Sequence, residues 1–410
     1  MTRINPSLCA KCKGYKRLCG LPYCPLLERY KWQVHGVQLI KDNDVEAPTP
    51  PSVLVGEHGY PYVRLYYTTT PGSTNPSIHD DPLTWANKEY SLRRIIALRS
   101  QTISGIIRIE AIHPWELYNK ELSLAAVSIK PVSSEVILER KPKPSLVFNG
   151  TTKPMGPASP ARKVTIEENP CIPKPIEKIL TDDIKSSKAV WYLYRHGINI
   201  YNIIKAFTLG MTGTLRNRKI VPTRWGITAV DSIIADRMIR EIRSYSIINE
   251  AQLYYRYYIG NSYTIIFLPE LYEAEWIEIW YPSTPWVPSY DKPAIVKVQE
   301  DHRGKFDKID GGYLAARLSV VEKLYSLHRQ AAVLIIREVF PSYYAPVGNW
   351  QIRETVRKAL VHPPVNKPRT IQELIEALNK YVRYDVKKLV KESYLIRKAC
   401  LQSRLDKWLP

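Results

Sequence analysis

The sequence predicts an α+β fold in which a small N-terminal zinc module precedes a mixed α/β domain with a central sheet and flanking helices. Three observations predict it. Four of the six cysteines lie in the first 24 residues, strand-like runs alternate with helical patterns, and residues 331–336 form an uninterrupted apolar run. Such a run is typical of a strand covered on both faces. With 410 residues, 45% of them hydrophobic, the chain is long enough for two domains with buried cores.

Residues 1–30 form the cysteine module, with the spacing C-x2-C-x6-C-x4-C. Zinc prefers four thiolates in a tetrahedron, and a C-x2-C pair lets two sulfurs reach one ion from a tight turn. Lysines and an arginine between the ligands would offset the negative charge of the centre. The pattern predicts a structural zinc site, with two disulfides or an iron–sulfur cluster as alternatives. Its ligands would be Cys9, Cys12, Cys19 and Cys24.

The next two segments differ in composition. Residues 50–130 carry short apolar runs around one helical pattern, TWANKEYSLRRIIALRS, which predicts a small α+β domain. Residues 131–178 are rich in proline, serine and lysine and have little periodicity. They are therefore predicted to form an extended connector on the surface.

Residues 179–400 are predicted to form the C-terminal α/β domain. Helical spacing and runs of β-branched and aromatic residues define its elements. The predicted helices cover 183–194, 200–207, 228–243, 313–327, 350–360, 371–381 and 385–400, and the predicted strands cover 252–259, 263–268, 273–281 and 331–336.

Residues 401–410 are predicted to be a clamp-binding tail, because they contain the pattern Q-x-x-L-x-x-W-L. On a short helical turn Leu405, Trp408 and Leu409 fall on one side and make an apolar plug, while Gln402 can hydrogen-bond a separate pocket. The pattern resembles the peptide with which replication and repair proteins bind the sliding clamp PCNA. The alternative is that these side chains dock on the chain's own core.

The net charge of +20 makes nucleic acid the first candidate partner, although an ion-paired thermophile surface is an alternative. No run approaches the roughly 20 apolar residues of a membrane-spanning helix, and residues 1–19 lack the apolar centre of a signal peptide. We therefore expect no membrane partner and a cytoplasmic, nucleoid-associated protein.

Two groups of polar residues are candidate DNA sites. A basic loop before the helix at 228–243 is a candidate cradle for phosphates, and it contains Arg216, Arg218, Lys219 and Arg224. A metal-dependent nuclease is a hypothesis for the second group, with His79, Asp80 and Asp81 as ligands of magnesium or manganese. Its candidate catalytic residues are Asp81, Asp231, Arg337, Glu338 and Arg353. The alternative is that Asp81 caps a helix and that Asp231 and Glu338 pair with arginines.

The chain as a whole resembles the archaeal Nre proteins, a family associated with DNA repair and clamp binding. The residues that carry the resemblance span nearly the full length. They include the cysteine pattern, 56–61 (GEHGYP), Arg99-Ser100, 154–157 (PMGP), 218–225 (RKIVPTRW), 227–231 (ITAVD), 311–317 (GGYLAAR), 329–334 (RQAAVL) and 350–354 (WQIRE).

The resemblance implies zinc at the four cysteines and clamp binding through Gln402, Leu405, Trp408 and Leu409. One departure is that Trp408-Leu409 stands where clamp-binding peptides often carry two aromatic residues. The leading hypothesis is a DNA repair factor that binds DNA and PCNA, with nuclease activity as one possibility. The alternatives are a non-catalytic adaptor that links PCNA to other repair proteins, and an RNA-processing protein.

Overall fold

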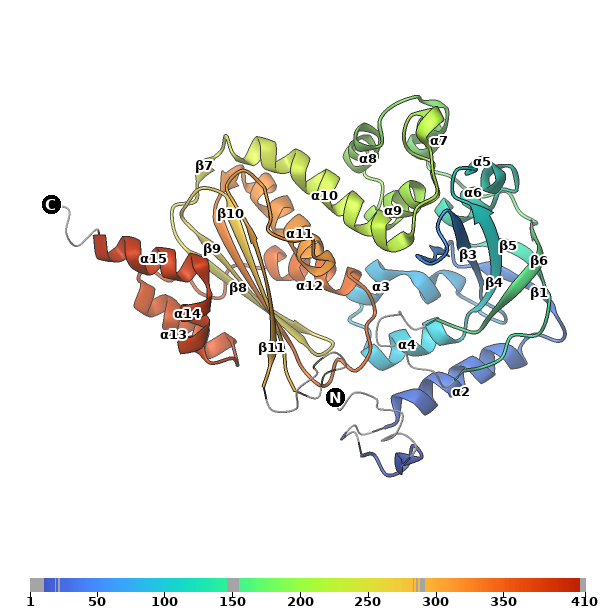
Figure 1. Cartoon of the computed structure of the whole chain (residues 1–410), viewed down its shortest axis with the longest axis horizontal. Helices are drawn as coiled ribbons and strands as arrows, with labels where there is room; N and C mark the ends of the chain where they lie inside the picture. Colours follow the sequence, from blue (N-terminus) through green and yellow to red (C-terminus); the bar gives the residue numbers. More distant parts are fainter. Residues whose placement is uncertain are drawn as a thin grey trace. The chain divides into compact units, whose positions relative to one another are not determined.

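The computed structural model of the chain describes residues 11–18, 20, 23–145, 155–282, 284, 287 and 292–405 (Figure 1). The chain folds into two compact units. The first is Tyr23–Ile234, and the second contains Ala235–Pro410, with which Met1–Pro22 is grouped. No helix among the described residues is long and apolar enough to cross a membrane.

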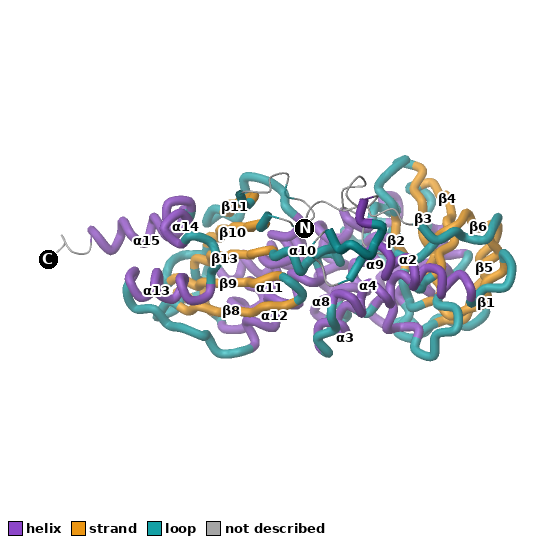
Figure 2. The backbone as a smooth tube through the Cα atoms, turned by 90° about the horizontal axis from the view of Figure 1, so that it is seen from below, coloured by secondary structure: helices purple, strands orange, loops and turns teal. Residues whose placement is uncertain are grey.

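A six-stranded sheet is the centre of the first unit, with strand order β1-β5-β6-β4-β3-β2 (Figure 2). Only the β4–β6 pair is parallel. Buried and more accessible residues alternate along β5 and over the first half of β3, as expected when one face of a strand packs on a core. The strands are β1 (Asp44–Thr49), β2 (Val53–Val55), β3 (Tyr62–Thr69), β4 (Ile103–Glu110), β5 (Val132–Leu138) and β6 (Ala158–Ile166).

Strands β5 and β6 correct the prediction of an extended connector over residues 131–178. Prolines misled the prediction, because they stand at places where a strand tolerates a missing N–H. Pro131 and Pro157 directly precede β5 and β6, and Pro160 lies near the start of β6. Both strands lie inside the sheet and pair antiparallel with each other.

Helices surround this sheet, and the predicted single helix at 84–100 is in fact two. Helix α3 ends at Asn87, Glu89 has a positive φ of 50°, and the Ser91 side chain caps α4. The helices of the first unit are α2 (Pro25–Gln38), α3 (Pro82–Asn87), α4 (Leu92–Ser100), α5 (Trp115–Asn119), α6 (Leu122–Val127), α7 (Lys174–Thr181), α8 (Ser186–Arg195) and α9 (Ile200–Thr208), with the 3-10 turns η1 (Pro76–Asp80) and η2 (Leu215–Asn217).

The boundary between the units differs from the predicted one at residue 179. It lies inside the 20-residue helix α10 (Thr223–Ile242), so α7, α8 and α9 belong to the first unit. Helical periodicity runs unbroken through this helix, which is why the sequence does not mark the boundary.

A five-stranded sheet with order β11-β10-β13-β9-β8 is the centre of the second unit. The β10–β13 pair is parallel, the other pairs are antiparallel, and every residue of the central strand β13 is buried. This confirms the predicted mixed α/β domain with a central sheet, and the apolar run at 331–336 is a strand buried on both faces, as predicted. The strands are β8 (Gln252–Tyr258), β9 (Asn261–Leu268), β10 (Glu273–Trp280), β11 (Ala294–Glu300) and β13 (Ala332–Val339); β7 (Ser246–Ile247) and β12 (Arg329–Gln330) form a separate parallel pair.

Helices cover both faces of this sheet (Figure 1). Helices α11 (Gly311–Leu327) and α12 (Trp350–Val361) pack together, and α12 contacts β8 and β9. On the other face α13 (Ile371–Tyr381), α14 (Val386–Glu392) and α15 (Tyr394–Leu405) share an apolar core with the strands. The fold is therefore mixed α and β, as predicted. The zinc module stays a prediction, because Cys9 and Cys19 lie outside the described residues.

Candidate functional site

The basic loop before α10 separates into one buried arginine and three exposed basic residues. Arg218 is only 4% exposed and donates to the carbonyls of Ile179, Leu180, Asp182 and Gly213 at 2.8–3.0 Å. Burial lowers the pKa of Arg218. Its donors hold the loop to the end of α7, so its predicted contact with phosphate is corrected to a structural role.

Arg216, Lys219 and Arg224 are exposed and stay candidates for contact with phosphate. The Arg224 guanidinium lies 3.5 Å from the Glu57 carboxylate, with 77% and 43% of the two side chains exposed. An ion pair so exposed contributes little stability, so a phosphate can compete for Arg224 at small cost.

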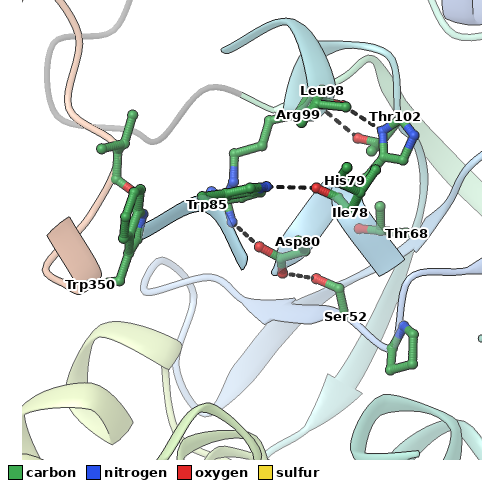
Figure 3. A network of polar contacts seen from close by, with 12 residues as sticks. Ser52, Thr68, Ile78, His79, Asp80, Trp85, Leu98, Arg99, Thr102 and Trp350 are labelled. Atoms are coloured by element: carbon green, nitrogen blue, oxygen red, sulfur yellow. Dashed lines mark hydrogen bonds and ion pairs between the residues drawn. The ribbon is translucent and has the colours of Figure 1, made fainter. Parts of the chain in front are cut away.

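Figure 3 shows the network around His79 and Asp80, two of the three predicted metal ligands. Asp80 accepts from Ser52 and forms an ion pair with Arg99. The His79 ring contacts the Leu98 carbonyl at 2.8 Å and the Ser73 hydroxyl at 3.0 Å.

Asp81, in contrast, caps α3 by accepting from the Thr84 N–H at 3.1 Å. Helix capping was the alternative to metal binding for this residue. Burial lowers the pKa of His79, which favours a neutral imidazole. Within the described ranges no three His, Cys, Asp or Glu side chains form a group that could hold a metal ion. His79, Asp80 and Asp81 therefore serve the packing of η1, α3 and α4.

Arg337 and Glu338 lie near the end of the buried strand β13 and, as neighbours in a strand, point to opposite faces of the sheet. Arg337 forms an ion pair with Glu278 and donates to the Asn261 amide oxygen at 2.7 and 3.0 Å. Glu338 accepts from Tyr281 at 2.6 Å and from Ser262 at 3.0 Å. The two residues therefore do not form one site.

Glu338 has a further structural role on the face covered by α13, α14 and α15. It accepts from the backbone N–H groups of Arg383 and Tyr384, both at 2.9 Å. These residues connect α13 to α14, so the carboxylate holds this connection to the sheet.

Asp231 and Arg353 are buried, with 0% and 1% exposure. Asp231 belongs to the first unit together with Asp81, whereas Arg337, Glu338 and Arg353 belong to the second. The structure therefore assigns the predicted catalytic residues to two different units.

A buried ion-pair network that the sequence did not indicate lies in the second unit. Arg317 on α11 donates to both oxygens of Glu300 at 2.6 and 2.7 Å, and both side chains are at most 1% exposed. Tyr272 and Tyr313 also donate to Glu300, and Asp236 accepts from Arg317 at 2.8 Å. Burial and the Glu300 carboxylate raise the pKa of both tyrosines, so that they stay protonated as donors.

Of the four predicted zinc ligands, the structure describes Cys12 and Cys24. Cys12 is buried at 7% exposure, and the backbone N–H groups of Leu18, Gly14, Arg17 and Lys16 lower the pKa of its thiol. Cys24 directly precedes α2 as its N-cap residue. Backbone donors around a sulfur stabilise a thiolate, which is the form that binds metal, so Cys12 fits the predicted role.

The predicted clamp motif begins where the described side chains end. The side chains of Gln402 and Leu405, and the whole of Trp408 and Leu409, lie outside the described residues. The preceding part of α15 is anchored firmly. Glu275 on β10 accepts from the Ser393 hydroxyl and from the N–H groups of Tyr394 and Leu395 at 2.6–3.0 Å.

Lys398 adds ion pairs with Glu270 and Glu273, and three residues later Leu401 is 60% exposed. The Glu275 contacts also explain why the predicted helix at 385–400 is divided: Ser393 separates α14 from α15 where the carboxylate caps the new helix.

Comparison with known proteins gives matches along almost the whole chain. The family model described as archaeal Nre, N-terminal, matches residues 18–287, and the one described as archaeal Nre, C-terminal, matches 299–408. DNA repair protein NreA of Archaeoglobus fulgidus is 39% identical over 90% of this chain and 92% of its own length. DNA repair protein NreB of the same organism is 31% identical over 95% and 97%.

DNA repair protein NreA of Haloferax volcanii is 30% identical over 78% of this chain and 79% of its own length. No solved structure matches the chain.

Proposed function

The chain belongs to the archaeal Nre family, and on this premise we propose that it is a DNA repair factor that binds DNA and is held at the sliding clamp PCNA by residues 402–409. The observation that carries the proposal is the near full-length similarity to relatives named as DNA repair proteins. The charge of +20 and the exposed Arg216, Lys219 and Arg224 support contact with the DNA backbone.

The contacts around the predicted catalytic residues support a binding factor rather than the nuclease hypothesis. Asp81 caps a helix and Glu338 holds the connection between α13 and α14. Asp231 and Arg353 are buried, and Arg337 is paired with Glu278. The contacts of Asp81, Glu338 and Arg337 maintain the fold, which favours a non-catalytic binding factor.

Survival after DNA damage tests the proposed function. We expect a strain of the source organism that lacks this gene to lose viability after treatment with DNA-damaging agents, because a step of repair is missing. The intact gene should restore survival. Survival equal to the parent strain under cross-linking, alkylating and ultraviolet damage would refute a role in repair.

We also propose that Cys9, Cys12, Cys19 and Cys24 hold one structural zinc ion, which would stabilise a segment too small to bury a core of its own. The N–H groups around Cys12 support this. We expect purified protein to contain about one zinc per chain and Cys12→Ser to lose it, because three thiolates bind zinc far more weakly than four. Metal analysis by mass spectrometry measures this.

The exposed Cys171 provides the matched control for that experiment. Cys171→Ser should keep its zinc, since this cysteine is far along the sequence from the module. A full equivalent of zinc in Cys12→Ser would show that the module does not bind the metal through this thiol.

A further inference from the structure

Two arginines face each other on the accessible side of the first unit's sheet. In the antiparallel register of β3 and β4, Arg64 stands directly opposite Arg108, and both side chains are exposed. Like charges directly opposite on neighbouring strands destabilise a sheet. Neither arginine forms an ion pair with another described residue. This arrangement favours an anion that lies across both strands.

The same side of these strands carries aromatic rings. Tyr62, opposite Glu110, is 54% exposed, and Tyr66, opposite Ile106, is half-buried. Alternation along β3 puts Tyr62, Arg64 and Tyr66 on one face, while Val63 and Leu65 point to the core.

A second pair of rings stands beside the edge strand β2. The Tyr60 and Trp225 ring centroids are 5.8 Å apart, and the two residues are 43% and 49% exposed. The Thr223 hydroxyl accepts from the Val55 N–H at 2.8 Å, which holds the start of α10 to β2. Gly59, with φ of 90°, allows the turn that presents Tyr60, since a Cβ there would lie 2.8 Å from the Tyr62 carbonyl.

Contacts through the loop after β2 connect the two groups of side chains. A Cβ on Gly56 would lie 3.6 Å from the Tyr66 ring and 3.9 Å from the Arg64 side chain. The next residue, Glu57, forms the exposed ion pair with Arg224. Glu110, opposite Tyr62, lies 3.3 Å from His113. We call the set Tyr60, Tyr62, Arg64, Arg108, Arg224 and Trp225 the arginine–aromatic face.

We propose that the arginine–aromatic face binds single-stranded DNA. Exposed rings of tyrosine and tryptophan can stack on bases, and stacking of this kind needs bases that are not already stacked and paired in a duplex. The three guanidinium groups would bind the phosphates between those bases, and a bound phosphate would remove the repulsion between Arg64 and Arg108.

The choice of DNA over RNA rests on the proposed function in DNA repair. The geometry itself favours a single strand with exposed bases and phosphates, whether DNA or RNA. The test therefore compares DNA with RNA. Its variants leave residues 402–409 intact. If this inference fails, the proposed role in repair is still decided by the survival experiment.

Fluorescence anisotropy with a labelled oligothymidylate strand and the full chain measures the binding. We expect Arg64→Ala/Arg108→Ala to weaken it about tenfold at low salt and to reduce the slope of log affinity against log salt by about 1.4, as for the loss of two phosphate contacts. Tyr60→Ala/Trp225→Ala should weaken it about tenfold or more with an unchanged slope, because stacking carries no counterion release.

Lys174→Ala/Lys188→Ala is the control with matched charge, since both lysines are exposed elsewhere on the first unit. It should bind as the parent chain does. The melting temperature of Arg64→Ala/Arg108→Ala should not fall, because the change removes a repulsion. Each double variant that keeps its melting temperature tests binding by the arginine–aromatic face independently of the other.

Affinity unchanged in the folded arginine and aromatic variants, or no binding of the strand by the parent chain, would overturn the proposal. So would tighter binding of the matching oligouridylate RNA, or of a duplex, than of the single-stranded DNA.

Discussion

Replacing Glu300 with glutamine is expected to lower the free energy of unfolding of the second unit by about 3–5 kcal/mol. Glu300 accepts from Arg317, Tyr272 and Tyr313 and is completely buried. Glutamine keeps the shape but turns one acceptor into a donor that faces other donors. The Arg317 charge would then lie in the interior with Asp236 alone to balance it, and an unbalanced buried charge is costly.

Chemical denaturation followed by tryptophan fluorescence measures this effect, with the two units treated as separate transitions. Asp236→Asn is the matched control. Its carboxylate also accepts from Arg317, but 49% of the side chain is exposed, so we expect a loss below about 1 kcal/mol. Equal effects of the two substitutions would mean that burial does not determine the strength of this network.

Periodicity predicted four of the five strands of the second unit's main sheet, because these strands are regular and bury one face or both, whereas the edge strand β11 was not predicted. The predicted strands at 252–259, 263–268 and 273–281 correspond to β8, β9 and β10 to within a few residues. In the first unit the prolines around β5 and β6 hid two strands of the sheet. Whether a segment that follows a proline forms a strand depends on its pairing with strands that are distant in the sequence, and this pairing cannot be read from the local sequence.

The candidate sites were harder to predict. In the sequence, a loop arginine that binds phosphate cannot be distinguished from one that donates to carbonyl groups of its own chain. Arg218 and Arg224 are six residues apart, yet one is buried among carbonyl groups of α7 and the other is 77% exposed. The opposition of Arg64 and Arg108 depends on strand register, which the sequence does not state. The Glu300–Arg317 pair likewise joins β11 to α11 across a loop.

The anchoring of α15 explains how residues 402–409 could serve as a docking peptide. Glu275 and the Lys398 ion pairs fix the first part of α15 to the sheet, and Cys400 packs against the same apolar core. A peptide that follows an anchored helix holds its partner close to the body of the protein. In the Q-x-x-L-x-x-W-L pattern, the apolar anchors Leu405, Trp408 and Leu409 would supply most of the binding energy.

Titration calorimetry of the full chain with the source organism's sliding clamp tests the central claim most directly. We predict that Trp408→Ala, or a stop after Leu401, weakens binding roughly a hundredfold or more, since loss of a buried aromatic anchor costs about 2–4 kcal/mol. Ser403→Ala, at a variable position of the pattern, should bind as the parent chain does. Undiminished affinity of the chain that stops after Leu401 would contradict the account.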